Sequence, residues 1–433
     1  MLEFKGDHVD PYYVLKLYAV AFVVIWVLAL LFKDRLKIDV SGPLLMRRTT
    51  RLRDLIDKIA NKEFNFKFRR LQYDSENEKL TLKSIAEPLR MSSIWKIIMN
   101  GGIPVAVFFM FLMLILLAYT LIIAIYGLLI GHGGGAAASG VGVAIPGLAI
   151  PGSSFTVPFT YGLIALVTVI VFHEFAHGIL ARAEGVKIKS IGLLLLAVLP
   201  GAFVEPDEEG VKKSSRLAKL RIYAAGSISN LAVAAVAILL MSLLLFSFVG
   251  PSFHPQGVEV QNTMPNTPAY GVLQNGMIIT HVNSYEVTNL TTFSDILSTK
   301  VKPGEEVNIT TNQGTFKLKA TTNPNSTNHA YLGVIVQNHL AVNQDVSSKY
   351  GTIIPWFLYS LYWLFYWIGF LNLGIGTFNL LPLKPLDGGL MLEELLNYVT
   401  SSDLANRITK TISIISLALV AGLFGVLFGS LIV

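Results

Sequence analysis

The stretch VFHEFAHGIL, residues 171–180, decides the architecture that this sequence predicts. It places His173, Glu174 and His177 inside an apolar run, from about 161 to 181, that is otherwise typical of a membrane-spanning helix. Ionisable side chains at membrane depth are costly, and where they occur they usually serve a function. The stretch therefore predicts a membrane helix that carries a functional site.

The composition also favours a membrane protein. Of the 433 residues, 53% are hydrophobic and only 14% are charged, whereas an average soluble protein carries about 25% charged residues. The chain contains no cysteine, so disulfides are excluded and a metal would need His or carboxylate ligands. The net charge of +6 gathers near the apolar segments and no Gly-rich phosphate loop is present, which argues against nucleic acid as a partner. The N-terminus lacks the features of a removable signal peptide.

Six segments contain the roughly 20 mostly apolar residues that a spanning helix needs. They lie near residues 11–32, 103–130, 161–182, 222–249, 352–381 and 408–433. The sequence thus predicts a polytopic α-helical membrane protein with about six transmembrane helices. We divide it into a first transmembrane helix (1–32), a basic cytoplasmic region (33–100), a membrane core (101–250), a small extramembrane domain (251–350) and a second part of the core (351–433).

The basic region, residues 33–100, contains a helical pattern of apolar side chains beside its arginines. The residues that recur at this spacing are Leu45, Leu52, Leu55, Ile56 and Ile59. The pattern is typical of an amphipathic helix. Such a helix either lies on an anionic membrane face or packs on its own domain as a solvated surface helix.

The distribution of Lys and Arg predicts an orientation in the membrane. The segments 33–100 and 184–221 are rich in Lys and Arg, whereas 131–160 contains neither. Because cytoplasmic loops carry an excess of these residues, we expect 33–100 and 184–221 in the cytoplasm and both termini outside. His173 then lies about nine residues, roughly 13 Å, from the cytoplasmic end of its helix, which places the site near the cytoplasmic face.

Residues 251–350 have a different pattern. Short apolar runs such as GVEVQN and GMIITHVNS alternate with turn residues, and this period-two alternation predicts a small mostly-β domain. By the orientation above, the domain lies outside. Three N-x-S/T patterns, at Asn289, Asn308 and Asn325, agree with that location.

The H-E-x-x-H pattern has a mechanical meaning on a helix. His173 and His177 are four residues apart and share a face, so both can reach one metal ion. Zinc with His ligands and one open position is the usual catalytic arrangement, and Glu174 can deprotonate the water in that position. The alternative is a chance match, which the membrane setting disfavours. We expect ordinary roles for the other histidines, which lie in predicted loops or in the β-domain: His8, His132, His254, His281, His329 and His339.

Asp387 is the best candidate for a third ligand. It lies in FNLLPLKPLDGGL, residues 378–390, where two prolines interrupt an apolar segment and Gly388 and Gly389 permit a tight turn. Irregular backbone is tolerated at membrane depth where it is buried in protein or lines a cavity. The helices at 161–182 and 352–381 run in the same direction, so Asp387 can meet His173 at one depth. The alternative is that Asp387 caps a turn without binding metal.

Together, HEFAHG and NLLPLKPLDGG resemble the site-2 protease family of intramembrane zinc metalloproteases. The resemblance covers roughly 161–250 and 352–400. It implies one Zn²⁺ per chain, bound by His173, His177 and Asp387, with Glu174 as the catalytic base. Two further residues match motif positions of the family and are implied as contacts of the substrate or of the oxyanion. They are Asn379, eight residues before the aspartate, and Asn230, which ends the G-x-x-x-N-like stretch GSISN.

Two other segments are similar to parts of that family. Residues 251–350 resemble an inserted PDZ domain, although Met277 stands where PDZ domains often have Asp. Such a domain would screen substrates by size or hold their peptide tails. Residues 186–209 match a membrane-re-entrant β-like loop, whose apolar run would offer a strand edge to a peptide. The alternative for this segment is a cytoplasmic loop that lies on the bundle.

The sequence therefore predicts a multi-pass cell-membrane protease that hydrolyses a peptide bond of a membrane-spanning protein substrate, as in regulated intramembrane proteolysis. Its partners are that substrate, the lipid bilayer and a peptide tail at the PDZ-like domain. One alternative is a membrane transporter or metal-handling channel that uses the His/Asp cluster as an ion path. Glu174 favours the enzyme, because an ion path needs ligands but no base beside the first His. A second alternative is a non-catalytic relative that acts as a scaffold.

Overall fold

The computed structural model describes residues 11–42, 44–49, 51–74, 79–129, 146–147, 156–196, 199–323 and 326–429. Its residues fall into two compact units. The first, which we call the membrane unit, comprises Met1–Leu239 with Trp363–Val433, and the second, the β-domain, comprises Leu240–Tyr362.

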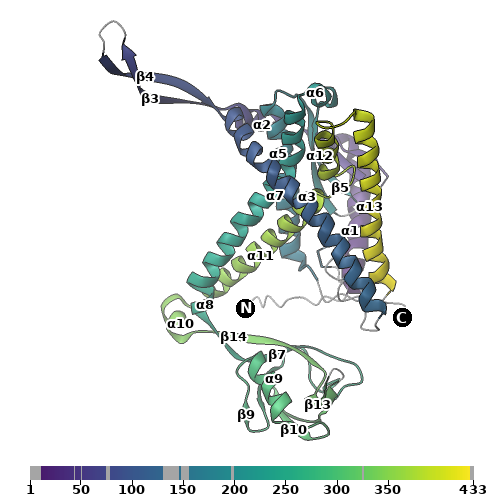
Figure 1. Cartoon of the computed structure of the whole chain (residues 1–433). Helices are drawn as coiled ribbons and strands as arrows, with labels where there is room; N and C mark the ends of the chain where they lie inside the picture. The colour runs from purple at the N-terminus through teal and green to yellow at the C-terminus, as the bar shows by residue number, and fades with distance from the viewer. Residues whose placement is uncertain are drawn as a thin grey trace. The chain divides into compact units, whose positions relative to one another are not determined.

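Long apolar helices form most of the membrane unit (Figure 1). Within the described residues, five helices are long and apolar enough to cross a membrane. They are α3 (Met91–Leu129), α5 (Phe159–Ala183), α7 (Arg216–Leu244, continued by the π-helix η1, Leu245–Val249, and by α8, Gly250–Ser252), α11 (Ile353–Asn379) and α13 (Ser402–Gly429). This chain is thus a multi-pass membrane protein, and the prediction of a polytopic helical fold is confirmed.

The sixth predicted segment is also helical, as α1 (Pro11–Leu36). It is not among the five helices that meet the criterion of length and composition within the described residues. Its last turn carries Lys33 and Arg35. Tyr18 fixes α1 to the rest of the unit, because its hydroxyl donates to the carbonyl of Pro146 at 2.7 Å and its ring meets Phe159 edge-on.

A four-stranded antiparallel sheet accompanies the helices. Its order is β1-β2-β5-β6, with bounds β1 (Asp39–Ser41), β2 (Leu44–Thr49), β5 (Ile188–Leu196) and β6 (Leu199–Pro206). Strand β5 is paired on both sides, with Leu45 of β2 opposite Leu195 and Val204 of β6 opposite Ile191. The segment predicted as a β-like loop, 186–209, therefore forms a hairpin, and β6 is the last strand of the sheet.

The basic region differs from its prediction. Leu45 does not belong to a helix with Leu52 and Ile56; it lies in β2, where pairing with β5 satisfies the backbone hydrogen bonds. The helix of this region is shorter, α2 (Arg51–Asn61). Ile56 is fully buried, and it packs with Ile188 and Val204 of the sheet. Helix α2 thus packs on its own domain, which was one of the two alternatives.

A long two-stranded hairpin forms the rest of the basic region, with β3 (Glu63–Asp74) and β4 (Lys79–Arg90) paired in one continuous antiparallel register. Figure 1 shows this hairpin extending away from the helices. No helix was predicted for 63–90, where apolar residues such as Phe64, Phe66 and Phe68 alternate with the period of a strand. The predicted helical pattern, Leu45 to Ile59, is helical from Leu52 onward, in α2.

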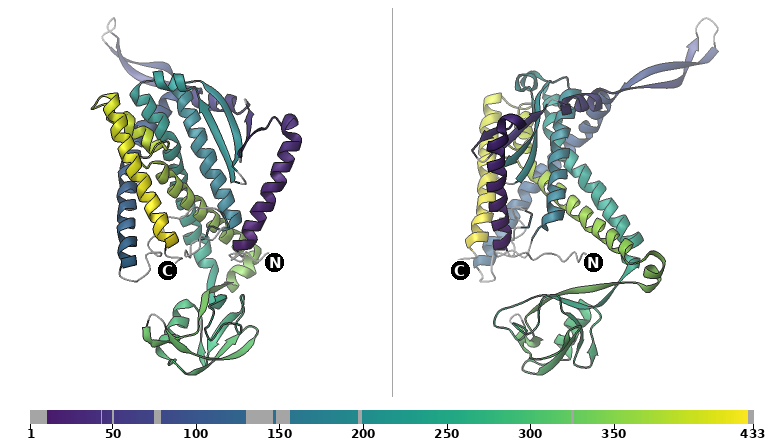
Figure 2. Two further views of the ribbon diagram at one scale, coloured as in Figure 1. Left: turned by 90° about the vertical axis from the view of Figure 1, so that its right-hand side faces the viewer. Right: turned by 180° about the vertical axis from the view of Figure 1, so that it is seen from behind.

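The core of the membrane unit surrounds α5. Helices α3, α5 and α7 share one apolar cluster with the short helix α12 (Asp387–Leu396), to which Met110, Leu180, Ala225 and Met391 contribute. A second cluster, with Leu117 and Leu423, joins α3 to α13, and the left view of Figure 2 shows these two helices side by side. The helix α6 (Glu208–Lys213) connects the sheet to α7. This packing joins α5 to α3, α7 and α12 in one apolar cluster.

The β-domain is a separate small fold. Its strands are β7 (Phe253–Thr263), β8 (Ile278–Val282), β9 (Tyr285–Glu286), β10 (Glu306–Thr311), β11 (Gly314–Lys319), β12 (Thr321–Asn323), β13 (Ser326–Tyr331) and β14 (Val334–Val342). Six of them form one sheet, with the order β11-β10-β8-β7-β14 and with β9 paired to β8. Helix α9 (Leu290–Thr299) contributes Phe293 to the apolar core, and α10 (Gln344–Tyr350) follows β14. The predicted mostly-β domain is confirmed.

Candidate metal centre

His173 and His177 on α5 direct their Nε2 atoms toward one another. His173 and His177 are one turn apart, and their Nε2 atoms are 3.2 Å apart. Their rings meet edge-on, with centroids separated by 4.7 Å. Helical spacing puts the two residues on one face, which is why the sequence pattern alone brings them together.

Asp387 comes to the same place from a distant part of the chain. After α11 ends, residues 380–386 turn back, and Asp387 is the first residue of α12. Its Oδ2 lies 3.5 Å from Nε2 of His173, and its Oδ1 lies 3.4 Å from Nε2 of His177. Gly388 and Gly389 allow this turn, because a Cβ on either residue would overlap the backbone of Leu380 or of Lys384.

The spacing of these three groups fits a metal ion. Tetrahedral zinc with ligand distances of 2.0–2.1 Å holds its ligand atoms about 3.3 Å apart. In this structure the two Nε2 atoms are 3.2 Å apart, and each of them lies 3.4 or 3.5 Å from one of the two carboxylate oxygens of Asp387. Within the part of the chain that the structure describes, His173, His177 and Asp387 are the one group of three or more such residues able to hold a metal ion.

Helix α7 supports each of the three groups from behind. The backbone carbonyl of Ile222 lies 2.7 Å from Nδ1 of His177 and can accept its proton. The hydroxyl of Ser227 donates to Oδ2 of Asp387 at 3.1 Å. The amide of Asn230 contacts Nδ1 of His173 at 3.2 Å. These contacts orient the side chains so that both Nε2 atoms and the carboxylate face one another, as supporting residues do in metal sites.

Asn230 is buried completely, and its amide has one unmatched atom. The Nδ2 atom faces Nδ1 of His173, whereas Oδ1 has no hydrogen-bond partner. A histidine whose Nε2 binds a metal carries its proton on Nδ1 and needs an acceptor there. Rotating the Asn230 amide by 180° presents Oδ1 to that proton and satisfies both groups. The unmatched oxygen thus fits a metal on the far side of His173.

Gly226 lets α7 approach the histidines closely. A Cβ at this position would lie 2.6 Å from both Cε1 and Nε2 of His173, and it would also meet Nε2 of His177. Gly376 likewise lets α11 approach α7 closely, because a Cβ added to Gly376 would lie 2.8 Å from Cβ of Asn230. Small residues at these two positions allow α5, α7 and α11 to pack with their backbones in close contact.

Glu174 is next to His173 on α5, but its hydrogen bond is to strand β6 and not to the three clustered residues. Its Oε2 accepts a hydrogen bond from the backbone N–H of Val204 at 3.0 Å. Val204 is paired with Ile191 of β5 on one side, so this N–H belongs to the outer edge of β6. The structure therefore places a carboxylate between the histidines of α5 and an edge strand.

The neighbours of Asp387 favour its ionised form. Helix α12 lies outside the five candidate spans. Burial alone would raise the pKa of Asp387, but the adjacent His177 and His173, together with the Ser227 hydroxyl, keep that pKa below its usual value. An ionised carboxylate is what a divalent cation needs as a ligand.

The remaining residues singled out from the sequence lie elsewhere. Asn379 is the last residue of α11 and is partly buried, and within the described residues no hydrogen bond joins it to the cluster. Four histidines lie on strands of the β-domain, as expected, namely His254, His281, His329 and His339. The positions of His8, His132 and Asn325 fall outside the described residues.

Ser227 and the carbonyl of Ile222 are the supporting groups that sequence reasoning missed. A signal for Ser227 was present, because it lies next to Gly226 and one turn from Asn230 in GSISN, on one face of a helix. Ile222 carries no signal of this kind, because every residue has a carbonyl.

Comparisons with known proteins agree with this geometry. The profile of Peptidase family M50 matches residues 161–423, a range that contains every residue of the cluster. An uncharacterized protein of Methanocaldococcus jannaschii is 34% identical over 237 residues, which cover 54% of this chain and 56% of that protein. A membrane-bound transcription factor site-2 protease homolog of Arabidopsis thaliana is 26% identical over 127 residues, covering 29% of this chain and 25% of that protein. The chain thus spans about half or less of the length of these curated relatives.

Among solved structures, two PDZ domains are similar to part of the chain. The PDZ domain of an SdrC-like protein from Listeria innocua is 23% identical, with a TM-score of 0.18, and covers 19% of this chain and 96% of that domain. The PDZ domain of the SdrC-like protein from Listeria monocytogenes is also 23% identical, with a TM-score of 0.17, and covers 21% of this chain and 92% of that domain.

Proposed function

Because the chain belongs to Peptidase family M50, we propose that it is an intramembrane zinc metalloprotease that hydrolyses a peptide bond within a membrane-spanning protein substrate. The observation that carries the proposal is the convergence of Nε2 of His173, Nε2 of His177 and the Asp387 carboxylate, with Glu174 beside them. All of these groups lie within the part of the chain that the family profile matches.

We assign His173, His177 and Asp387 as the ligands of one Zn²⁺ per chain. Their separations and the groups behind them on α7 support this assignment. When bound, Zn²⁺ supplies Lewis acidity, which polarises a carbonyl and lowers the pKa of a water to about 7.

Glu174 is assigned as the general base. Its carboxylate takes a proton from the attacking water and gives that proton to the nitrogen of the leaving amine. The hydrogen bond from Val204 holds one carboxylate oxygen, Oε2, and so fixes the direction of the other. This arrangement lets Glu174 act on protons without competing with Asp387 for the metal.

The outer edge of β6 is assigned as the place where the substrate lies. A helical carbonyl is hydrogen-bonded and shielded by side chains, so the segment that is cut must first become extended. An extended segment can add to the free edge of a sheet through main-chain hydrogen bonds. The N–H of Val204 marks that edge and touches Glu174, so a strand added there would run past the catalytic carboxylate.

The two asparagines take different roles in this proposal. Asn230 is completely buried and contacts His173, which makes it a positioning residue for that ligand rather than a contact of the oxyanion. Asn379 is partly exposed at the end of α11, and it keeps its assignment as a contact of the substrate or of the oxyanion.

The β-domain is proposed to select substrates, either as a filter for size or as a holder of peptide tails. Met277, which stands where PDZ domains often have Asp, is buried in the core of this domain and accepts a weak hydrogen bond from the N–H of Gln274. We place the β-domain outside the cell and the site near the cytoplasmic face. This orientation follows from the Lys and Arg of 33–100 and 184–221, compared with their absence from 131–160.

An ion path is supported less well than a protease. A path through a membrane needs successive sites, whereas the described residues contain one three-residue group able to hold an ion. Glu174 contacts the sheet at Val204 and is not a member of that group.

The test is a cleavage assay with the purified full chain in liposomes. The probes are single-span membrane proteins whose spanning segment contains Gly, Pro or Asn, with products located by mass spectrometry. We expect a cut inside the membrane segment that a zinc chelator stops and added zinc restores. Glu174→Gln should bind zinc and lose at least 10²-fold in rate, whereas Glu208→Gln, on the exposed surface of α6, should cleave normally. Cleavage by Glu174→Gln at the normal rate would refute the assignment.

A further inference from the structure

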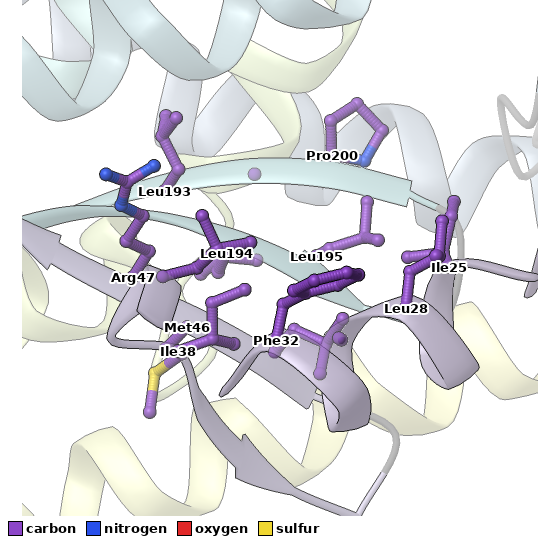
Figure 3. Close-up of a pocket in the computed structure, with 14 residues that line it drawn as sticks. Ile25, Leu28, Phe32, Ile38, Met46, Arg47, Leu193, Leu194, Leu195 and Pro200 are labelled. Atoms are coloured by element: carbon purple, nitrogen blue, oxygen red, sulfur yellow. The ribbon is translucent and has the colours of Figure 1, made fainter. Parts of the chain in front are cut away.

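An apolar groove lies between α1 and the sheet of the membrane unit, away from the metal centre. Its volume is about 580 Å³. In Figure 3, Ile25, Leu28 and Phe32 of α1 lie along one side, facing Leu194 and Leu195 of β5. Several of these side chains are open to the surroundings, since Leu28 is 49% exposed and Phe32 is 41% exposed. Neither the protease chemistry nor the β-domain uses this surface.

One positively charged side chain, that of Arg47, lies at the end of the groove. Arg47 is the charged residue among the 14 that line it, and Figure 3 shows Arg47 at the opposite end of the row from Ile25. Arg47 is exposed and makes no ion pair within the described residues, whereas its neighbour Arg48 is paired with Asp39 at 2.8 Å. An unpaired arginine beside an apolar surface at a membrane attracts an anion, and its planar guanidinium matches a phosphate.

Positive charge is in excess at the adjoining end of α1, where three cations surround Asp34. Lys33 and Arg35 are in the last turn of that helix, and Lys37 follows it. All three side chains are exposed. Each Lys or Arg close to an anionic membrane surface adds about 1 kcal/mol of attraction. The groove therefore combines an apolar floor with a cationic end, which is the pattern of a phospholipid with its chain and its headgroup.

The lining is poorly suited to a peptide. An extended peptide at membrane depth needs partners for its backbone groups. The strands β2 and β5, which line most of the sheet side of the groove, are already paired on both sides, and only β6, through Pro200 and Gly201, has an unpaired edge. A helix with its side chains is about 10–12 Å across. An acyl chain is thinner and needs no hydrogen bonds.

We infer that this groove binds an anionic phospholipid, with a hydrocarbon chain between α1 and β5 and the phosphate at Arg47. The inference does not depend on the proposed protease activity. The lipid would fill the space between α1 and the sheet, while Tyr18 fixes the other end of the helix at Pro146.

The test measures bound lipid on the purified full chain by native mass spectrometry, after incubation with an equimolar mixture of phosphatidylglycerol and phosphatidylcholine. The unaltered chain should retain phosphatidylglycerol in preference. Arg47→Gln should lower that retention about tenfold or more, because a charge-assisted contact to phosphate is lost. Arg48→Gln makes the same charge change on the next residue, whose partner is Asp39, and should stay within about twofold. Leu28→Trp, which fills the groove, should lower the retention of both lipids.

Three results would overturn the inference. They are equal losses in Arg47→Gln and Arg48→Gln, equal retention of the two lipids by the unaltered chain, and cross-linking of a photoreactive residue at position 194 to a protein segment rather than to lipid. The thermal unfolding midpoint of each variant, compared with that of the unaltered chain, distinguishes loss of the site from loss of the fold.

Discussion

Gly226→Ala tests whether α7 truly forms the back wall of the metal centre. The added Cβ would lie 2.6 Å from Nε2 and Cε1 of His173, whereas ordinary van der Waals contact begins at 3.4 Å. The ring of His173 must therefore move by about 0.8 Å, and the ring of His177, whose Nε2 would lie 2.4 Å from the added Cβ, by about 1.0 Å. Metal ligands tolerate errors of roughly 0.2 Å in distance, so the movement is several times larger than the site can absorb.

The expected result is a loss of metal affinity by about 10–100-fold, as for other changes behind a metal ligand. Overpacking of this size also costs about 1–3 kcal/mol in the free energy of unfolding. Zinc per chain is measured by elemental mass spectrometry across a series of free-zinc concentrations, and the unfolding midpoint is measured in parallel. Gly374→Ala is the matched control, because it adds the same methyl to α11 at a position with no atom within 4 Å. Equal zinc affinity in the two variants would refute the close approach of α7 to the histidines.

Three further predictions concern other parts of the account. Ser227→Ala removes the hydrogen bond to Asp387 and should lower zinc affinity about tenfold, whereas Ser229→Ala, which touches only the carbonyl of Phe172, should not; equal titrations of the two would remove Ser227 from the site. A tag in 33–100 should be shielded from protease in intact cells while the β-domain is accessible, and access to both from the same side would refute the orientation. Replacing 253–345 with a flexible linker should leave zinc content unchanged and broaden cleavage to substrates with large external domains; unchanged selectivity would exclude the β-domain from substrate choice.

The convergence of His173, His177 and Asp387 was predictable from sequence because the chemistry of a metal site restricts the residue types and their spacing. Two histidines at helical spacing must share a face, and the membrane setting makes idle ionisable groups costly. Asp387 was identified from the prolines and glycines around it, which mark irregular backbone. The lengths of the membrane-spanning segments were also predictable, because the thickness of the bilayer sets how many apolar residues each segment needs.

The pairing of the sheet was not predictable. Leu45, Leu52 and Ile56 match a helical period, but Leu45 lies in a strand whose partner, β5, is far away in the chain. A short apolar run is ambiguous between strand and helix until its partner is known. The contact between His177 and the carbonyl of Ile222 could not be predicted for another reason. Every residue has a backbone carbonyl, so the residue type at position 222 gives no signal. The groove at Arg47 likewise exists only when α1 and the sheet are placed together.

Zinc K-edge X-ray absorption on the purified chain, compared with Asp387→Ala, tests the central claim most directly. The account predicts one zinc per chain with two imidazole nitrogens and one carboxylate in its first shell, and loss of the carboxylate contribution and of affinity in the variant. Identical zinc spectra and occupancy in the two proteins would show that Asp387 does not bind the metal, and the proposed centre would be wrong.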